Sequence, residues 1–273
     1  MREPLYAGSF YSSSKPELES ELNLLFQVKT DYISDAVGII VPHAGYLFSG
    51  RVAAKAYKTI SKINKKRFVI LGVDHYGAGI IATSKQNWKT PLGEAEIDLE
   101  FVNKITKEQA IIVDEIAMKR EHSIEVQLPF LQHIFKDFKF VPIQLPFISY
   151  EEIQHLAKIL RDRDSFYIAS SDFTHYGTNF GFFPRESIED PVRYVEDLDN
   201  KIAELIQRFD PKQFLDYIIK NDLTICGSIP IALLLEITKN LEAKKIEKIA
   251  YDNSFSVSKD IANIVGYCSL LVR

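Results

Sequence analysis

The chain has 273 residues, of which 46% are hydrophobic and 26% are charged, and this is the composition of a globular protein. Its 33 Lys and Arg against 37 Asp and Glu give a net charge of −4, which argues against a nucleic-acid-binding protein, because such surfaces need concentrated positive charge. The first residues lack the apolar core of a signal peptide, and no apolar run reaches the roughly 18–20 residues of a membrane span. The two cysteines, Cys226 and Cys268, are too few for a disulfide framework and fit a reducing compartment. We therefore expect a cytoplasmic protein and exclude the secreted, membrane and disordered classes.

Short apolar runs rich in β-branched residues predict five strands. They are Val37–Val41, Arg67–Val73, Phe138–Ile143, Phe166–Ala169 and Ile261–Val272. Runs that are apolar throughout are typical of strands covered on both faces, as in a mainly parallel sheet.

Helical patterns alternate with these strands. The predicted helices are Ser14–Phe26, Gly50–Ile63, His122–Phe135, Glu151–Leu160, Pro191–Phe209, one that begins at Asp210-Pro211, and Ser228–Leu241. The first opens with a capping-box pattern, Ser14 to Glu17, and Asp210 with Pro211 is a typical helix start. Since no linker or repeat interrupts the series, we predict one α/β domain over residues 1–273, with a mostly parallel central sheet and helices on both faces.

The six histidines are distributed unevenly along this pattern. His43, His75 and His175 each follow a predicted strand, and each has a glycine close by. Because ligands of open α/β sheets bind outside the carboxyl ends of the strands, these three imidazoles are expected at one sheet edge. Imidazole is a common ligand for zinc, copper and iron. One such histidine would usually be structural, but three of them support a metal or acid–base site about as well as a structural role.

Cys226 stands just before the helix predicted at Ser228. A helix N-terminus favours the thiolate, the reactive and metal-binding form, although a buried and inert cysteine is the commoner state. Cys268 lies inside an apolar strand and is expected in the core. His122 opens a helix and could be a cap, an outer partner of a site or a site residue, with a structural or outer role favoured. His133 and His155 lie in mid-helix and are expected to pack or to face solvent.

Motifs for several other activities are missing from the sequence. It contains no dinucleotide-binding or phosphate-binding glycine loop, no Gly-x-Ser-x-Gly elbow, no His-Glu-x-x-His motif and no Cys-x-x-Cys pair. The usual nucleotide-dependent, serine-hydrolase and zincin mechanisms are therefore not predicted.

Nearly the whole chain resembles the Memo family, also described as component B of the AmmeMemoRadiSam system. The resemblance is carried by motifs that occur in the same order along the chain. They are Ala7-Gly8-Ser9-Phe10-Tyr11, Pro42-His43-Ala44-Gly45-Tyr46, Leu71-Gly72-Val73-Asp74-His75, Thr90-Pro91-Leu92-Gly93, Glu121–Phe130, Ser170-Ser171-Asp172-Phe173-Thr174-His175 and Thr224-Ile225-Cys226-Gly227.

This resemblance implies a fold like that of the class III extradiol dioxygenases, which hold a non-haem iron at the sheet edge. His43 and His75 match the two histidine ligands, and His175 matches the acid–base histidine, with Asp172 beside it. Cys226 stands where the dioxygenases have a carboxylate ligand. A thiolate favours softer ions and is easily oxidised, so ordinary ring cleavage is not the first expectation. The system's name also implies a radical-SAM protein and a third component as partners.

Three hypotheses follow. In the first, the protein binds iron or copper, with zinc less expected, through His43, His75, Cys226 and His175; His175 could instead be an acid–base group, and Asp172 would orient an imidazole or bind substrate. In the second, the chain is a module that binds a peptide or protein and keeps the cleft of an enzyme ancestor. In the third, it is an iron-dependent dioxygenase-like oxidoreductase acting on a small aromatic or cyclic molecule.

Overall fold

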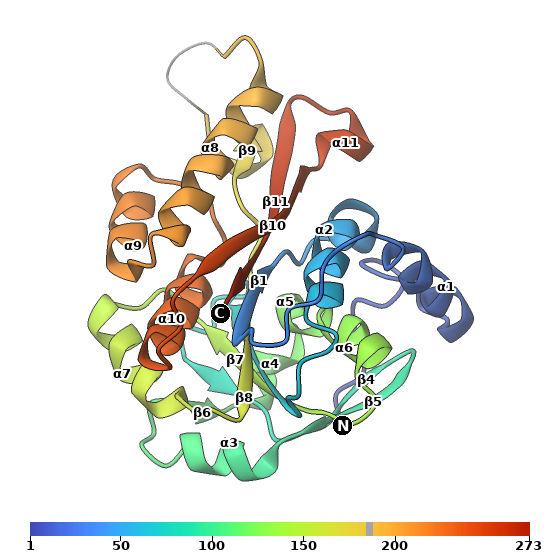
Figure 1. The fold of residues 1–273 in the computed structure, drawn as a ribbon, viewed down its shortest axis with the longest axis vertical. Coiled ribbons are helices and arrows are strands. Elements are labelled where there is room, and N and C mark those ends of the chain that lie inside the picture. The colour runs from blue at the N-terminus through green and yellow to red at the C-terminus, as the bar shows by residue number, and fades with distance from the viewer. Residues whose placement is uncertain (184–187) are drawn as a thin grey trace.

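A computed structural model describes residues 1–183 and 188–273 (Figure 1). In these ranges the strands are β1 Gly38–Val41, β2 Arg67–Val73, β3 Ala82–Thr83, β4 Trp88–Thr90, β5 Gly93–Ile97, β6 Ile112–Val113, β7 Lys139–Leu145, β8 Ser165–Ser170, β9 His175–Gly177, β10 Ile246–Asn253 and β11 Asn263–Val272. The helices are α1 Lys15–Leu25, α2 Tyr46–Thr59, α3 Leu99–Ile105, α4 Glu115–Lys119, α5 His122–Glu125, α6 Leu128–Ile134, α7 Tyr150–Leu160, the 3₁₀ turn η1 Thr178–Phe180, α8 Pro191–Gln207, α9 Pro211–Lys220, α10 Ser228–Asn240 and α11 Phe255–Ser258.

The strands form one mixed sheet with the path β10-β11-β1-β8-β2-β7-β3-β6. Its four central strands, β1, β8, β2 and β7, are parallel to their neighbours in that group, as their apolar runs predict. β11 and β10 extend the sheet on the other side of β1 in antiparallel fashion. The prediction of a single-domain α/β fold with a mostly parallel central sheet is thus confirmed.

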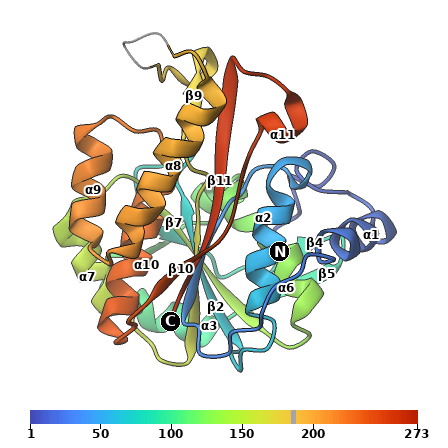
Figure 2. The ribbon, with the colours of Figure 1, turned by 45° about the horizontal axis from the view of Figure 1, so that its top comes forward.

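Helices cover both faces of this sheet (Figure 2). On one side lie α1, α2 and α6, and on the other lie α7, α9 and α10. Every residue of β1 and β8 is buried between these layers, which explains why both strands are apolar. None of the helices in the described ranges is long and apolar enough to span a membrane.

Three of the predictions about helices are wrong. The helix predicted over 122–135 is two helices, because Pro129 lacks the N–H that would bond to the Glu125 carbonyl in a continuous helix. α2 begins at Tyr46, four residues before the predicted start. At α1, the Ser14 side chain accepts no capping hydrogen bond within the described residues, so the predicted capping box is absent.

The sheet register brings the ends of three central strands together. Val41, the last residue of β1, pairs with Ser170, the last residue of β8, and β8 also pairs with β2. The chain leaving β1 therefore runs beside the chain leaving β8, and the chain leaving β2 emerges next to both. This shared edge is where the motifs of the sequence converge.

Candidate metal centre

His43, His75 and Cys226 meet at this edge. One ligand atom from each residue can be chosen so that all three atoms lie within 4.8 Å of one another. His43 Nε2 is 3.3 Å from Cys226 Sγ, and the His43 and His75 rings meet edge to face with centroids 5.1 Å apart. Residues separated by as many as 183 positions thus form one group of metal-binding atom types.

His75 is oriented by a buried carboxylate. Its Nδ1 lies 2.9 Å from Glu121 Oε1, and the same carboxylate accepts the backbone N–H groups of His75 and Ser123 at 3.2 and 2.8 Å. Burial opposes ionisation of Glu121, but the hydrogen bonds from His75 and Ser123 hold its pKa below the ordinary value. Since a carboxylate only accepts, His75 carries its proton on Nδ1, and Nε2 is the nitrogen with a free lone pair.

His43 lies in a fully buried polar setting. Its Nδ1 is 3.0 Å from Ser170 Oγ. Its backbone N–H donates to Asp172 Oδ1 at 2.8 Å, and Asp172 Oδ2 is 3.9 Å from His43 Nε2. Burial, with His75 and His175 nearby, lowers the pKa of His43, while burial raises the pKa of Asp172. Asp172 therefore supports the turn that carries His43, as an outer partner would.

Cys226 is held by a close contact between two loops. Gly227, the N-cap of α10, donates its N–H to Ser171 Oγ at 3.0 Å, and a Cβ on Gly227 would lie 2.4 Å from the Cβ of Ser171. Only glycine permits this approach. Burial, followed by the Asp172 carboxylate, raises the pKa of the Cys226 thiol, and this opposes the thiolate that the helix N-terminus favours.

His175 lies at the same edge but outside the group of three. Its Nδ1 is 2.9 Å from both the Phe173 and the Thr224 carbonyl oxygens, and its ring packs edge-on against Phe180 at 5.0 Å. Carbonyl oxygens only accept, so His175 also carries its proton on Nδ1 and keeps a lone pair on Nε2. This arrangement suits a base or hydrogen-bond acceptor beside the cluster. A ligand role for His175 stays a prediction.

His122 and Glu121 contribute more than the sequence suggested. The His122 ring lies 4.2 Å from that of His75 and 5.4 Å from that of His43. Its Nδ1 is buried with no hydrogen-bond partner among the described residues, and burial with the two neighbouring imidazoles lowers the pKa of His122 to about 3. This position is compatible with an outer partner and with a site residue, since ligand atoms of His75, Glu121 and His122 also lie within 4.8 Å of one another. Glu121 was missed, because an acidic residue before a helix is usually only a cap.

The N-terminal segment forms a wall beside these histidines. Arg2 is buried and ion-paired to Glu125 at 2.5 Å, and Glu125 also accepts the backbone N–H of Tyr6 at 2.9 Å. Tyr6 and Phe10 then pack on His122, with ring centroids 5.3 and 5.0 Å away. The start of the chain is thus fixed to the same short helix that carries His122.

The remaining histidines lie away from the cluster, as predicted. His133 packs on Phe26 with centroids 4.6 Å apart, and His155 is exposed, 3.7 Å from Glu108. Cys268 is buried in β11. Within the described ranges, none of these three residues belongs to a group of candidate metal ligands.

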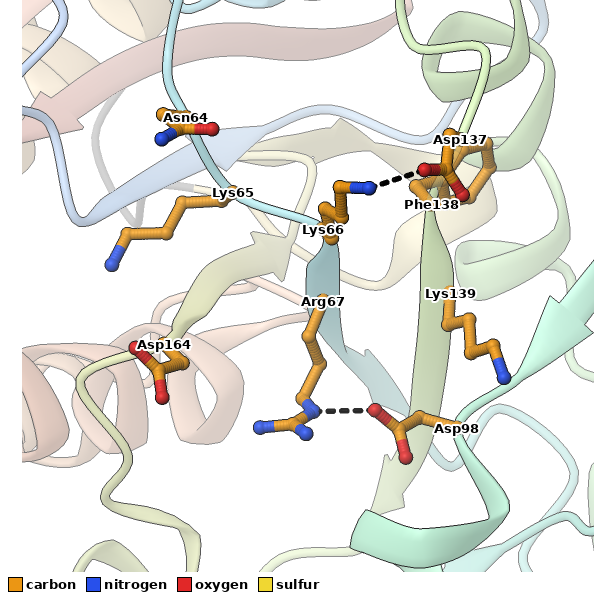
Figure 3. A pocket seen from close by; sticks show the side chains of 9 residues that line it. All are labelled: Asn64, Lys65, Lys66, Arg67, Asp98, Asp137, Phe138, Lys139 and Asp164. Carbon is orange, nitrogen blue, oxygen red and sulfur yellow. Dashed lines mark hydrogen bonds and ion pairs between the residues drawn. The ribbon is translucent and has the colours of Figure 1, made fainter.

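A cavity of about 380 Å³ lies at the amino ends of β2 and β7, the edge opposite to the histidines (Figure 3). Two ion pairs lie within its wall: Arg67 Nε is 2.6 Å from Asp98, and Lys66 pairs with Asp137. These pairs join neighbouring elements, so we interpret the cavity as structural.

Comparison with known proteins agrees with the sequence resemblance. The family model described as Memo-like protein matches residues 2–271. MEMO1 family proteins of Methanosarcina barkeri and Thermococcus onnurineus are each 36% identical, over all of this chain and 99–100% of their own length. A MEMO1 family protein of Nitrosopumilus maritimus is 35% identical over 98% of both chains.

Proposed function

The chain belongs to the Memo-like protein family, and on this premise we propose that it binds one redox-active metal ion, iron or copper, through His43, His75 and Cys226. The observation that carries the proposal is that three donor atoms of suitable type lie within 4.8 Å of one another. Further support comes from the hydrogen bonds that hold both imidazoles at Nδ1, as outer partners of metal ligands usually do.

The chemical types of the three donor atoms indicate which metal ions the site would bind well. A thiolate with two imidazoles is softer than the two-histidine, one-carboxylate set of non-haem iron oxygenases, and it suits copper well. A bound copper or iron ion would supply one-electron chemistry at the sheet edge. The protein's own part is to hold the ligands, to release to solvent the proton that the Cys226 thiol must lose, and to present Asp172 and His175 beside them.

His175 is proposed as the acid–base group of the site. With Nδ1–H donated to backbone carbonyls, its Nε2 can accept a proton or a hydrogen bond from a molecule in the cleft. Asp172 is proposed to keep the His43 turn in place through its two backbone N–H contacts. The relation to extradiol dioxygenases and the radical-SAM partner remain predictions of the family resemblance.

Metal analysis of untagged, anaerobically purified protein tests the proposal. Near-stoichiometric iron or copper should be present in the wild type and lost in a His43→Ala/Cys226→Ala variant. A His155→Ala/Cys268→Ala variant is the control, because it removes the same residue types outside the cluster and should keep the metal. Zinc in the wild type would favour a hydrolytic or structural role. No metal, even after reconstitution, would overturn the proposal in favour of a peptide- or protein-binding module.

Oxygen uptake by the iron-loaded protein tests the dioxygenase alternative. A panel of catechols that stimulates uptake in the wild type, but not in His175→Ala, would support it. A uniformly negative panel would argue against it.

A further inference from the structure

The Ser170 hydroxyl, next to His43, has three polar neighbours within hydrogen-bond distance. They are the Ser123 carbonyl oxygen at 2.6 Å, Gln127 Nε2 at 2.9 Å and His43 Nδ1 at 3.0 Å. Ser170, Ser123 and Gln127 are fully buried. A hydroxyl donates one hydrogen bond and accepts two, so three partners use all of its capacity.

The orientation of the Gln127 amide follows from its other contacts. Its Nε2 also lies 3.0 Å from the carbonyl oxygen of Pro42, which can only accept. The amide nitrogen must therefore face Pro42 and Ser170, and Oε1 on the opposite side accepts the Tyr57 hydroxyl at 2.9 Å. Gln127 is thus a donor to Ser170.

The single proton of the Ser170 hydroxyl is then assigned by elimination. The Ser123 carbonyl only accepts, so it takes that proton. One lone pair of Ser170 accepts from Gln127, and the other is left for His43. His43 must accordingly donate from Nδ1.

We propose that Ser170, oriented by the Ser123 carbonyl and Gln127, is a positioning residue that holds neutral His43 in its Nδ1–H tautomer. In that tautomer the lone pair of His43 is on Nε2, the nitrogen 3.3 Å from Cys226 Sγ. In the other tautomer a hydrogen would occupy this position, and the ring would have to exchange its proton before it could bind a metal there. The role of this tautomer in metal binding rests on the proposed function, whereas the tautomer itself does not depend on a bound metal.

The network is specific to His43. His75 and His175 are held in the same tautomer by a carboxylate and by backbone carbonyls, which need no further orientation because they only accept. A hydroxyl can donate or accept, so only for His43 must neighbouring groups decide the direction of the bond. Ser170 ends β8, and the groups that orient its hydroxyl come from the α5–α6 segment, from α2 and from Pro42, the residue after β1. The tautomer of His43 therefore depends on how four separate parts of the chain pack.

Nitrogen-15 NMR of the metal-free protein at a pH where His43 is neutral measures the tautomer directly. In the wild type, His43 should show a protonated Nδ1 and an unprotonated Nε2. Ser170→Ala removes the acceptor and should shift His43 towards the Nε2–H form. The control is Ser269→Ala, which removes a buried β11 hydroxyl that has no hydrogen-bond partner in the described structure and should leave His43 unchanged. His75 and His175 are internal references, since their acceptors remain in both variants.

Metal titration gives the second measurement. Ser170→Ala should weaken binding about 10–100-fold, the usual effect of losing an outer partner, and Ser269→Ala should not. An Nε2–H tautomer of His43 in the wild type would overturn the inference, even if Ser170→Ala failed to fold. An unchanged tautomer or unchanged affinity in folded Ser170→Ala would overturn it as well. A wild type that binds no metal but has Nδ1–H on His43, lost in Ser170→Ala, would refute the proposed function and leave the tautomer assignment standing.

Discussion

Replacing Glu121 with glutamine tests how far a buried carboxylate controls the candidate centre. Glu121 accepts three hydrogen bonds, from His75 Nδ1, the His75 backbone N–H and the Ser123 backbone N–H. In Glu121→Gln, one carboxylate oxygen becomes an NH₂ group, which cannot accept. The side chain is similar in size, so the change removes charge and acceptor capacity with little change in packing.

Two magnitudes follow from these contacts. If the remaining oxygen takes the place of Oε1, the backbone N–H of His75 faces an NH₂ group, and a buried donor without an acceptor costs about 1–3 kcal/mol of unfolding free energy. Metal affinity should fall about 10–100-fold, or roughly 1.4–3 kcal/mol, because His75 loses the carboxylate that fixes its ring and raises its basicity.

Competition with a chromophoric chelator would measure metal affinity, and urea unfolding of the metal-free protein would measure stability. Glu115→Gln is the control, because Glu115 also accepts a backbone N–H and a hydroxyl, from Lys85 and Ser84, but touches no histidine. The reasoning is refuted if folded Glu121→Gln binds metal as tightly as the wild type, or if Glu115→Gln loses as much affinity.

Three further predictions concern the thiol, a buried aspartate and a glycine. Because burial raises the pKa of the Cys226 thiol, metal binding should release the thiol proton, and calorimetry should find affinity rising about tenfold per pH unit between about pH 6 and pH 8, with a flatter profile in Cys226→Ser. Burial raises the pKa of Asp199 from 3.8 to about 6, so its contribution to stability is complete below about pH 4 and is lost as pH rises through 6. Urea unfolding of metal-free protein should then show Asp199→Asn gaining up to about 3 kcal/mol relative to the wild type between about pH 4 and pH 7; a constant difference would contradict this. A Cβ on Gly72 would lie 2.4 Å from Ile124, so Gly72→Ala should lose about 1–3 kcal/mol of stability and displace α5. Gly45→Ala should be milder in the same unfolding assay, because a Cβ on Gly45 would come no closer than 3.5 Å to the Phe10 carbonyl oxygen.

The short apolar runs in the sequence were sufficient to predict the strands of the central sheet. Arg67–Val73 is predicted with the bounds that β2 has, because a short apolar run between polar turns has few other stable conformations. The edge elements were missed for the opposite reason. β10, Ile246–Asn253, is only partly buried along most of its length and mixes charged with apolar residues, so its strand conformation comes from pairing with β11.

The residue types of the candidate site were also evident from the sequence. Imidazoles after parallel strands must meet at one edge, and the order of motifs indicated which cysteine joins them. The sequence could not show that the pKa of the Cys226 thiol is raised, since this pKa depends on atoms that other segments bring near it. Strand position by itself could not separate His175 from His43 and His75, because all three follow predicted strands.

Sequence alone therefore determined the fold class, the family and the histidines and cysteine worth testing, because periodicity and motif order are properties of the chain itself. The tertiary structure decided which groups form hydrogen bonds with each of these side chains. Glu121 reaches His75 from 46 residues away, and Ser170 reaches His43 from 127 residues away. A proton's position on an imidazole is set by which acceptor lies opposite it, and only the folded sheet edge places those acceptors.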